Sequence, residues 1–303
     1  MIQYNVFKHF APVAACIVLL STISCNKNGV NTTNSHEYSD TPHHNILTGG
    51  SIPEASGIAD SKANPGYLWV EEDSGNPSQL YLLGHDGKIA GKVKIAGGTN
   101  RDWEDIVLGV GPVDGTSYLY IGDIGDNSST YASYTFYRFA EPTINVANIG
   151  SASVTKFSRI NFKYPDSSHD AEAFLVDPNT KDIYVITKRD VKSKVYKLAY
   201  PQDTTKLITA VYVSDLAFDL VTSATISPDS KELIVKTYTN LYFYARSPTE
   251  SIATTLSHTP STLGYDLEQQ GEAVCFALDY SGFYTLSETR TATPATLDFY
   301  KRN

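Results

Sequence analysis

Five short segments of the chain repeat one pattern, in which an acidic or hydroxyl residue precedes a small or polar residue and then an apolar strand. The repeated residues lie 48, 68, 51 and 49 positions apart. They are Ser56, Glu104, Glu172, Ser223 and Glu272. A second apolar stretch that carries aromatic residues follows each of them. A repeat of about fifty residues with several strands per unit predicts a β-propeller, so we expect an all-β fold with five blades.

The strand pattern also predicts how each blade is completed. For blades two and three it places the fourth strands at residues 154–162 and 207–213, and it gives blade four only a weak fourth strand. Blade five shows three strands, and residues 44–49, which precede blade one, can supply its fourth strand and cover the open sheet edge. Six blades are the alternative, because the stretch 123–170 is long enough to contain a further unit. No stretch shows sustained helical periodicity.

The N-terminal residues 1–24 have the form of a signal peptide, with Lys8 before an apolar run and small residues at its end. The apolar run is too short to span a membrane. Cys25 follows directly, which resembles the lipobox of bacterial lipoproteins, although Thr22 stands where Leu is usual. The resemblance implies cleavage before Cys25 and a lipid on its sulfur. Plain cleavage, with Cys25 as a bystander, is the alternative.

Residues 25–43 are rich in Asn, Thr, Ser and His, which predicts a flexible tether after the lipidated Cys25. Residues 44–303 then form a single propeller domain. We expect a monomer anchored by lipid to a membrane of the bacterial cell envelope. The periplasmic side is favoured over the cell surface, because no acidic run follows Cys25.

The composition supports strands and excludes one class of partner. Aromatic residues make up 12% of the chain, and Tyr alone accounts for 21 residues, which suits strands better than helices. The net charge of −9 argues against nucleic-acid binding but is compatible with cations and neutral ligands.

The repeated oxygen-bearing residues predict a metal site. The inner strand of every blade begins near the propeller axis, so Glu104, Glu172 and Glu272 should lie close together, with Ser56 and Ser223 from the other blades. In blade four the neighbouring Thr222 is the alternative to Ser223. At roughly 5 Å and an effective dielectric constant near 20, each pair of carboxylates costs about 3 kcal/mol. The inner motifs contain no Lys, and Arg101 is the nearest base in the sequence. A divalent cation is the simplest counter-charge, and Ca²⁺ tolerates irregular oxygen geometry better than Mg²⁺. Hydrogen bonds from backbone amides or water are the alternative.

Charged residues also recur where each second strand ends and in the loops before the inner strands. These ends return to the face where the inner strands begin, so they predict a rim for a small polar or anionic ligand. Charged strand ends in contact with solvent are the alternative interpretation. His169 could act as an acid or base, or make a structural hydrogen bond. The rim candidates are Asp73, Arg101, Asp123, Asp126, His169, Lys188, Arg189, Glu288 and Arg290.

Several motifs together resemble a group of secreted bacterial propeller proteins of unsettled function, which are labelled esterase-like or phytase-like. The most specific segments are Asp-Trp-Glu-Asp at residues 102–105 and Gly-Asp-Ile-Gly-Asp-Asn at residues 122–127. The resemblance extends over nearly the whole mature chain and implies the propeller fold.

The chain also resembles, more distantly, the calcium-activated nucleotidases, which are five-bladed apyrases. That family holds one Ca²⁺ in its tunnel by one residue per blade in the order Ser, Glu, Glu, Ser, Glu. The residues in that order here are Ser56, Glu104, Glu172, Ser223 and Glu272. The acidic turn at residues 73–75 lacks the family's Arg, and loop lengths differ. The resemblance therefore implies the metal site more strongly than nucleotide hydrolysis.

These observations favour a Ca²⁺-stabilised binding or interaction module. The alternative is a Ca²⁺-dependent phosphoester hydrolase, in which the ion bridges to a phosphate and Asp73 or Asp123 positions water. The sequence has no G-x-S-x-G segment, P-loop, EF-hand or zinc-ligand spacing, which disfavours the common enzymes and metal sites that use them.

Overall fold

The computed structural model describes Met1, residues 37–289 and residues 295–303. The signal peptide, the lipidation of Cys25, most of the tether and the rim candidate Arg290 lie outside the described residues. None of the helices within them is long and apolar enough to cross a membrane.

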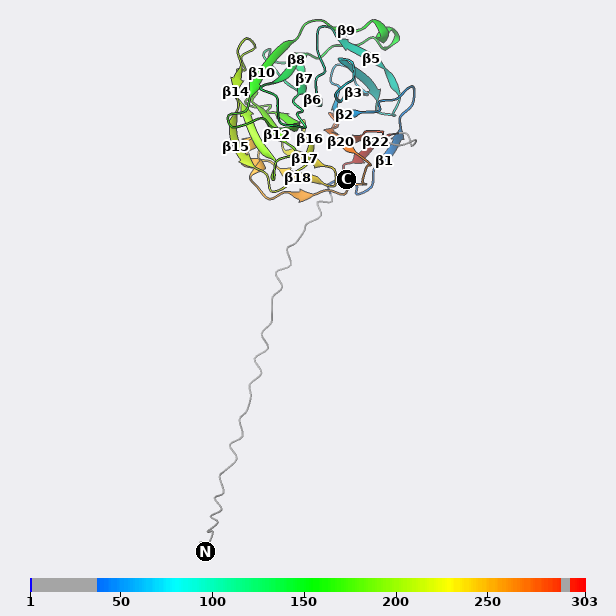
Figure 1. Ribbon diagram of the computed structural model, residues 1–303. Coiled ribbons are helices and arrows are strands. Elements are labelled where there is room, and N and C mark those ends of the chain that lie inside the picture. Colours follow the sequence, from blue (N-terminus) through cyan, green and yellow to red (C-terminus); the bar gives the residue numbers. More distant parts are fainter. Residues whose placement is uncertain (2–36, 290–294) are drawn as a thin grey trace. The chain divides into compact units, whose positions relative to one another are not determined.

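The strands of the described residues form five sheets around a common centre, which confirms the predicted five-bladed propeller (Figure 1). The alternative of six blades is wrong, because the strands within residues 123–170 belong to the sheets of blades one and two and form no further sheet. The inner strands are β2 (Ala55–Asp60), β6 (Trp103–Val110), β11 (Ala171–Val176), β16 (Val221–Ile226) and β20 (Gly271–Phe276). Each contacts the inner strands of its two neighbours, and β20 contacts β2, so the ring is closed.

Each inner strand pairs antiparallel with the next strand of its blade. The second strands are β3 (Tyr67–Glu72), β7 (Ser117–Asp123), β12 (Ile183–Thr187), β17 (Glu232–Thr237) and β21 (Gly282–Ser287). The third strands are β4 (Gln79–Gly84), β8 (Tyr134–Ala140), β13 (Lys194–Leu198), β18 (Leu241–Ala245) and β22 (Thr296–Lys301). The second strand of every blade therefore ends at the face where the inner strands begin.

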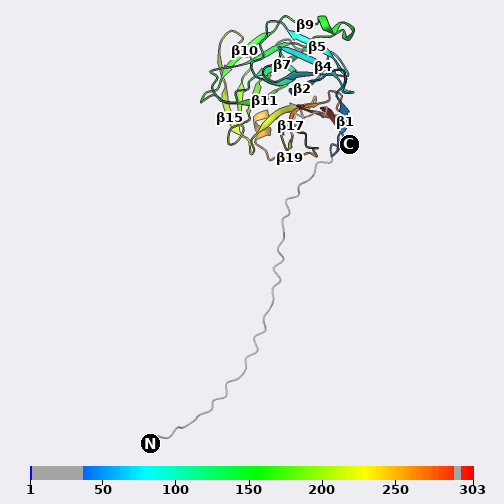
Figure 2. The same ribbon diagram turned by 45° about the vertical axis from the view of Figure 1, so that its right-hand side comes forward.

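The fourth strands are β5 (Ile89–Ile95), β10 (Ser158–Lys163), β15 (Val211–Asp215), β19 (Ser261–Thr262) and β1 (His43–Ile46). Strand β1 pairs antiparallel with β22, with His43 opposite Phe299, and is the fourth strand of blade five. The short 3₁₀-helix η1 (Val146–Ser151) and helix α1 (Ile252–Leu256) lie in connections between strands. Figure 2 shows the blades from a second direction.

Two predicted fourth strands are each divided between neighbouring blades. The segment 154–162 is not one strand, because β9 (Ser153–Val154) pairs parallel with β5 of blade one and only β10 belongs to blade two. Likewise, β14 (Ile208–Thr209) pairs parallel with β10, whereas β15 belongs to blade three. Both segments pass from one blade to the next, so the chain hydrogen-bonds to both sheets during the crossing.

The hydrophobic core consists of five clusters in the described residues, one at each junction between blades. The inner strands β2, β11 and β20 are buried along their whole length, because they lie between two neighbouring sheets. Burial on both faces explains why these strands are apolar without strict alternation. It also leaves their first residues as the places where polar side chains can reach the channel.

Candidate functional site

Every inner strand contains a β-bulge at its start, and in four of the five blades the bulge positions the predicted ligand residue. The register shifts lie between Trp103 and Asp105, between Ala171 and Ala173, and at the same place in the other blades. A bulge leaves its extra residue outside the ladder and redirects its side chain. The residues at the bulges are Ser56, Glu104, Glu172, Thr222 and Glu272.

In blade four the bulge holds Thr222, whereas the sequence pattern indicated Ser223. Ser223 lies one layer deeper, where its Oγ donates to Asp105 Oδ2 across the channel at 3.3 Å. The same oxygen accepts a hydrogen bond from the Val274 amide at 3.3 Å. Burial raises the pKa of Asp105 well above its usual value, although backbone amides and Ser223 donate to it. Asp105 and Ser223 therefore join opposite sides of the channel beneath the mouth.

The two hydroxyl residues at the bulges bond to the neighbouring blade. Ser56 Oγ donates to the Glu104 carbonyl at 2.8 Å, and Thr222 Oγ1 donates to the Gly271 carbonyl at 3.2 Å. Both hydroxyl protons are thus used to join inner strands.

A cavity of about 190 Å³ opens at the mouth of the channel. All its lining residues are polar or charged: Glu54, Ser56, Asp73, Glu104, Asn127, Glu172, Lys188, Arg189, Tyr238, Gln270, Glu272 and Glu288. The predicted residues Ser56, Glu104, Glu172 and Glu272 are therefore brought together, and Ser223 is not among the lining residues.

Glu104 is the least compensated carboxylate of this cavity. Glu104 is only 4% exposed to solvent. Among the described residues it has no hydrogen-bond or ion-pair partner. Burial, followed by the charges of Glu172, Asp73 and Asp102, raises its pKa well above the usual value. A buried carboxylate without a donor is costly, so a cation or a proton must be expected here.

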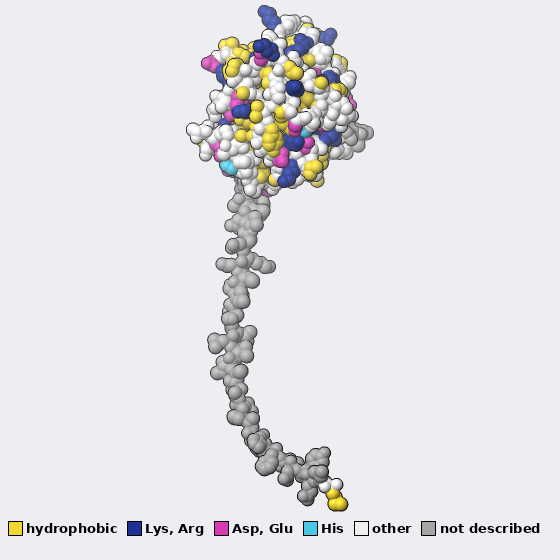
Figure 3. Space-filling model, turned by 60° about the vertical axis from the view of Figure 1, so that its left-hand side comes forward, with side chains coloured by type: hydrophobic (Ala, Val, Ile, Leu, Met, Phe, Trp, Pro, Cys, Tyr) yellow, Lys and Arg dark blue, Asp and Glu magenta, His cyan; other side chains and the backbone are white. Residues whose placement is uncertain are grey.

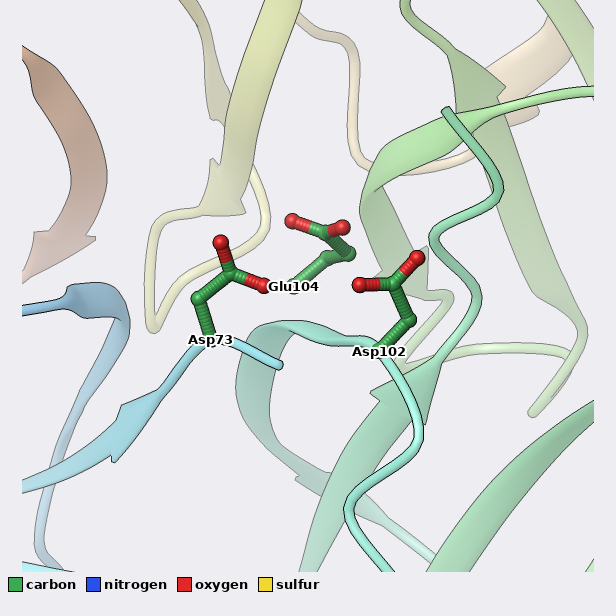
Figure 4. A group of neighbouring side chains, drawn as sticks. All are labelled: Asp73, Asp102 and Glu104. Atoms are coloured by element: carbon green, nitrogen blue, oxygen red, sulfur yellow. The ribbon is translucent and has the colours of Figure 1, made fainter. Parts of the chain in front are cut away.

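Glu104 belongs to two groups of carboxylates whose oxygens lie within 4.8 Å of one another. The first carboxylate group is Asp73, Asp102 and Glu104, and Figure 4 shows their carboxylates turned toward one another. The second carboxylate group is Glu104, Asp170 and Glu172. Oxygen clusters of this kind can hold a divalent cation, and no ion is part of the structure. Asp102 and Asp170 were not among the predicted ligands, although each stands two residues before a bulge Glu.

Neighbouring residues hold the first carboxylate group in place. Asn100 Nδ2 donates to the Glu72 and Asp73 carbonyls at 2.8 and 3.0 Å, which fixes the turn after β3 against the loop before β6. A Cβ atom at Gly125 would lie 2.0 Å from Glu104 Oε1 and 2.7 Å from Asp102 Oδ2. Gly125 therefore preserves the space beside these carboxylates.

Lys188 supplies a positive charge that the inner motifs lack. It follows β12, is 2% exposed, and donates to Glu172 and to the Tyr238 hydroxyl. Its Nζ lies 3.9 Å from Glu272 Oε2, while the Tyr238 hydroxyl donates to Glu272 Oε1 at 2.9 Å. Burial lowers the pKa of Lys188, but Glu172 and Glu272 raise it further, so the net shift is upward. The ammonium group stays charged and lies between two of the predicted ligands.

Several rim candidates make contacts outside the mouth. Arg101 lies 4.0 Å over the Tyr131 ring, donates to the Ser133 carbonyl, and has its Nε 3.9 Å from Asp123 Oδ1. Among the described residues, its ion pair is therefore with Asp123 and not with either carboxylate group. Asp123 accepts the Asp102 amide at 2.8 Å.

Asp126 accepts hydrogen bonds from the Thr130 and Tyr131 amides and the Tyr134 hydroxyl, and so organises a loop. Buried His169 lies between Asp166 and Asp190, at 3.2 and 3.1 Å, in a network that also includes Tyr196.

The other rim candidates in the described residues line the mouth cavity. Arg189 Nε lies 2.6 Å from Asp170 Oδ2 and is 45% exposed. Glu288 follows β21 and also lines the cavity. On the face that Figure 3 shows, positive and negative side chains are scattered among one another rather than gathered by sign.

No protein-family model matches the chain, and no curated protein matches it. It is similar to a solved structure of Kuenenia stuttgartiensis hydrazine synthase, with 15% sequence identity and a TM-score of 0.41, over 80% of this chain and 57% of that chain. A nidogen/laminin complex structure is similar at 11% identity and a TM-score of 0.43, over 77% of this chain and 72% of that chain. The chain thus spans less than two thirds of the hydrazine synthase chain. These similarities are too weak to support a function.

Proposed function

We propose that the chain is a lipid-anchored protein of the bacterial cell envelope whose propeller binds Ca²⁺ at the channel mouth and acts as a binding or interaction module. The observation that carries the cation site is Glu104, a buried carboxylate without a partner among the described residues, beside other carboxylates. An all-oxygen donor set that is irregular in geometry suits Ca²⁺.

The form of residues 1–24 and the Cys25 that follows them support the envelope location. The first described residues of the domain do not line the mouth cavity. Tyr38 pairs with Arg302, at the end of blade five opposite the mouth. A ligand of the module therefore has access to the mouth without displacing them. We expect the domain to be a monomer that does not bind nucleic acid.

The cation is tested by titrating Ca²⁺ into chelator-stripped protein, with binding measured by calorimetry and by the change in melting temperature. We expect saturable binding and a higher melting temperature. Glu104→Gln should reduce the affinity at least about tenfold, a difference of about 1.4 kcal/mol. The control is Asp86→Asn, which removes one carboxylate in an exposed turn away from the cavity. Equal affinity in Glu104→Gln and the native protein would contradict a site at the mouth.

The second candidate function is a Ca²⁺-dependent phosphoester hydrolase. It is favoured by Lys188 and Arg189, which line the same cavity as the carboxylates and could bind an anionic group. A bound divalent ion would supply Lewis-acid activation of a phosphate there. Release of inorganic phosphate from nucleotides or phytate, measured with and without a chelator, separates the two functions. Lack of release over a broad panel, together with Ca²⁺ binding, would favour the binding module.

A further inference from the structure

The two carboxylate groups at the mouth differ in the positive charges that the protein places beside them. In the second carboxylate group, Asp170 has Arg189 Nε at 2.6 Å, and Glu172 accepts a hydrogen bond from Lys188. Two of its three members thus already have a cationic partner. A divalent ion bound there would have to displace or crowd these side chains.

Lys188 is especially hard to displace because it is held on several sides. It is almost completely buried, it donates to Glu172 and Tyr238, and its Nζ lies 4.7 Å over the Tyr238 ring. Tyr238 in turn donates to Glu272. The ammonium group therefore lies between Glu172 and Glu272, where a cation held equally by all the blades would be expected.

The first carboxylate group has no such partner. Within the described residues, no Lys or Arg nitrogen forms an ion pair with Asp73, Asp102 or Glu104. No donor among the described residues forms a hydrogen bond with the Glu104 carboxylate, and Glu104 is only 4% exposed. Burial and, next, the charge of Asp73 raise the pKa of Asp102 to about 6. Ser74 donates hydrogen bonds to Asp73 and Asp102, and the charge of Lys188 acts on Glu104 without an ion pair between them. The negative charge of this group is therefore only partly compensated, and Gly125 leaves room beside it for the Glu104 and Asp102 carboxylates.

We infer that the divalent cation binds away from the channel axis, on Asp73, Asp102 and Glu104, and that the Lys188 ammonium replaces an axial ion between Glu172 and Glu272. This inference rests on the proposed cation binding at the mouth and specifies its ligands. It differs from a site with one ligand from each blade, because only blades one and two supply the ligands. In this arrangement the ion pair of Lys188 with Glu172 occupies the position near the channel axis.

The ligands are tested by measuring Ca²⁺ affinity and stoichiometry by calorimetry in single variants of the full domain. Asp73→Asn and Asp102→Asn should each weaken binding at least about tenfold, and Glu272→Gln should change it less than about threefold. Glu272→Gln is the informative comparison because it leaves Lys188 paired with Glu172. Loss of binding in Glu272→Gln together with full binding in Asp73→Asn would overturn the inference. Absence of binding in the native protein would instead refute cation binding itself.

The role of Lys188 is tested by Lys188→Met, which removes the ammonium group but keeps a long side chain. Freed Glu172 and Glu272 should then accept a second ion, so the stoichiometry should rise from one to two. The control is Lys194→Met, which removes a partly exposed ammonium paired with Asp166 outside the mouth. Circular dichroism confirms folding, and Lys188→Gln is used if Lys188→Met is unfolded. A stoichiometry that stays at one in a folded Lys188 variant would contradict the assigned role.

Discussion

Glu104 and Glu172 occupy equivalent bulges in neighbouring blades, yet their carboxylates meet different partners. Glu172 receives a hydrogen bond from Lys188, whereas Glu104 receives none from the described residues and faces Asp73 and Asp102. The residue after the second strand decides this difference, since Lys188 follows β12 whereas Ile124 follows β7 at the equivalent position. The same residue type is therefore part of an internal ion pair in one blade and a candidate metal ligand in the next.

The raised pKa values at the mouth predict how Ca²⁺ stabilisation depends on pH. Because the pKa of Asp102 in the folded protein is about 6, above its usual 3.8, the metal-free fold binds more protons than the unfolded chain between these values. This contribution to metal-free stability is fully present below pH 3.8 and is lost as the pH rises through 6. Ca²⁺ requires the ionised carboxylates, so it should raise the melting temperature more at pH 8 than at pH 5.

The measurement is thermal unfolding with Ca²⁺ and with chelator at the two pH values. Proton release on binding, measured by calorimetry in buffers of different ionisation enthalpy, should accompany it. An equal or larger Ca²⁺ effect at pH 5 would contradict ionisation of this group on binding.

At the scale of the element, a recurring β-bulge lets each inner strand turn one side chain toward the channel. A regular strand would alternate its side chains between two buried faces, and the bulge redirects one of them to the channel. The same bulge in blade four presents Thr222, whose hydroxyl serves a neighbouring strand instead of the cavity. One local geometry therefore positions both candidate metal ligands and contacts between blades.

Thr222→Val should test this structural role, because it preserves the shape of a fully buried side chain and removes its hydroxyl. We expect unfolding free energy to fall by about 1 kcal/mol, since the Gly271 carbonyl loses a donor. Ca²⁺ affinity should be unchanged. Thr222→Ser, which keeps the hydroxyl, is the matched variant. Urea denaturation measures the first expectation and calorimetry the second; a large loss of Ca²⁺ affinity in Thr222→Val alone would make Thr222 part of the metal site.

At the scale of the whole molecule, residues near both ends of the described domain meet on blade four. The Tyr38 hydroxyl donates to Glu232 Oε2 at 2.6 Å, and Arg302 Nη1 donates to Glu232 Oε1 at 2.9 Å. The Tyr38 ring also packs on Phe243, with 6.4 Å between centroids, and on Phe283, with 5.1 Å. These contacts join blade five to blade four.

Tyr38→Ala should therefore destabilise the domain by about 3 kcal/mol, as expected for the loss of a buried aromatic ring. Tyr38→Phe keeps the ring and should cost only about 1 kcal/mol. Urea unfolding measures both, and Ca²⁺ affinity should be unchanged because Tyr38 lies away from the mouth. Equal, small effects of the two substitutions would show that the ring contacts do not stabilise the closed propeller.

The sequence alone determined the features that depend on local repetition. The spacing of the five motifs predicted five blades, and it located Glu104, Glu172 and Glu272 at one mouth because repeated strands have repeated positions. Tertiary structure decided which carboxylates have partners, since Lys188 and Asp73 come from strand ends of different blades and meet the glutamates only in space. It also decided between Thr222 and Ser223, because a one-residue bulge changes which side chain faces the channel and leaves no separate trace in the hydrophobic pattern.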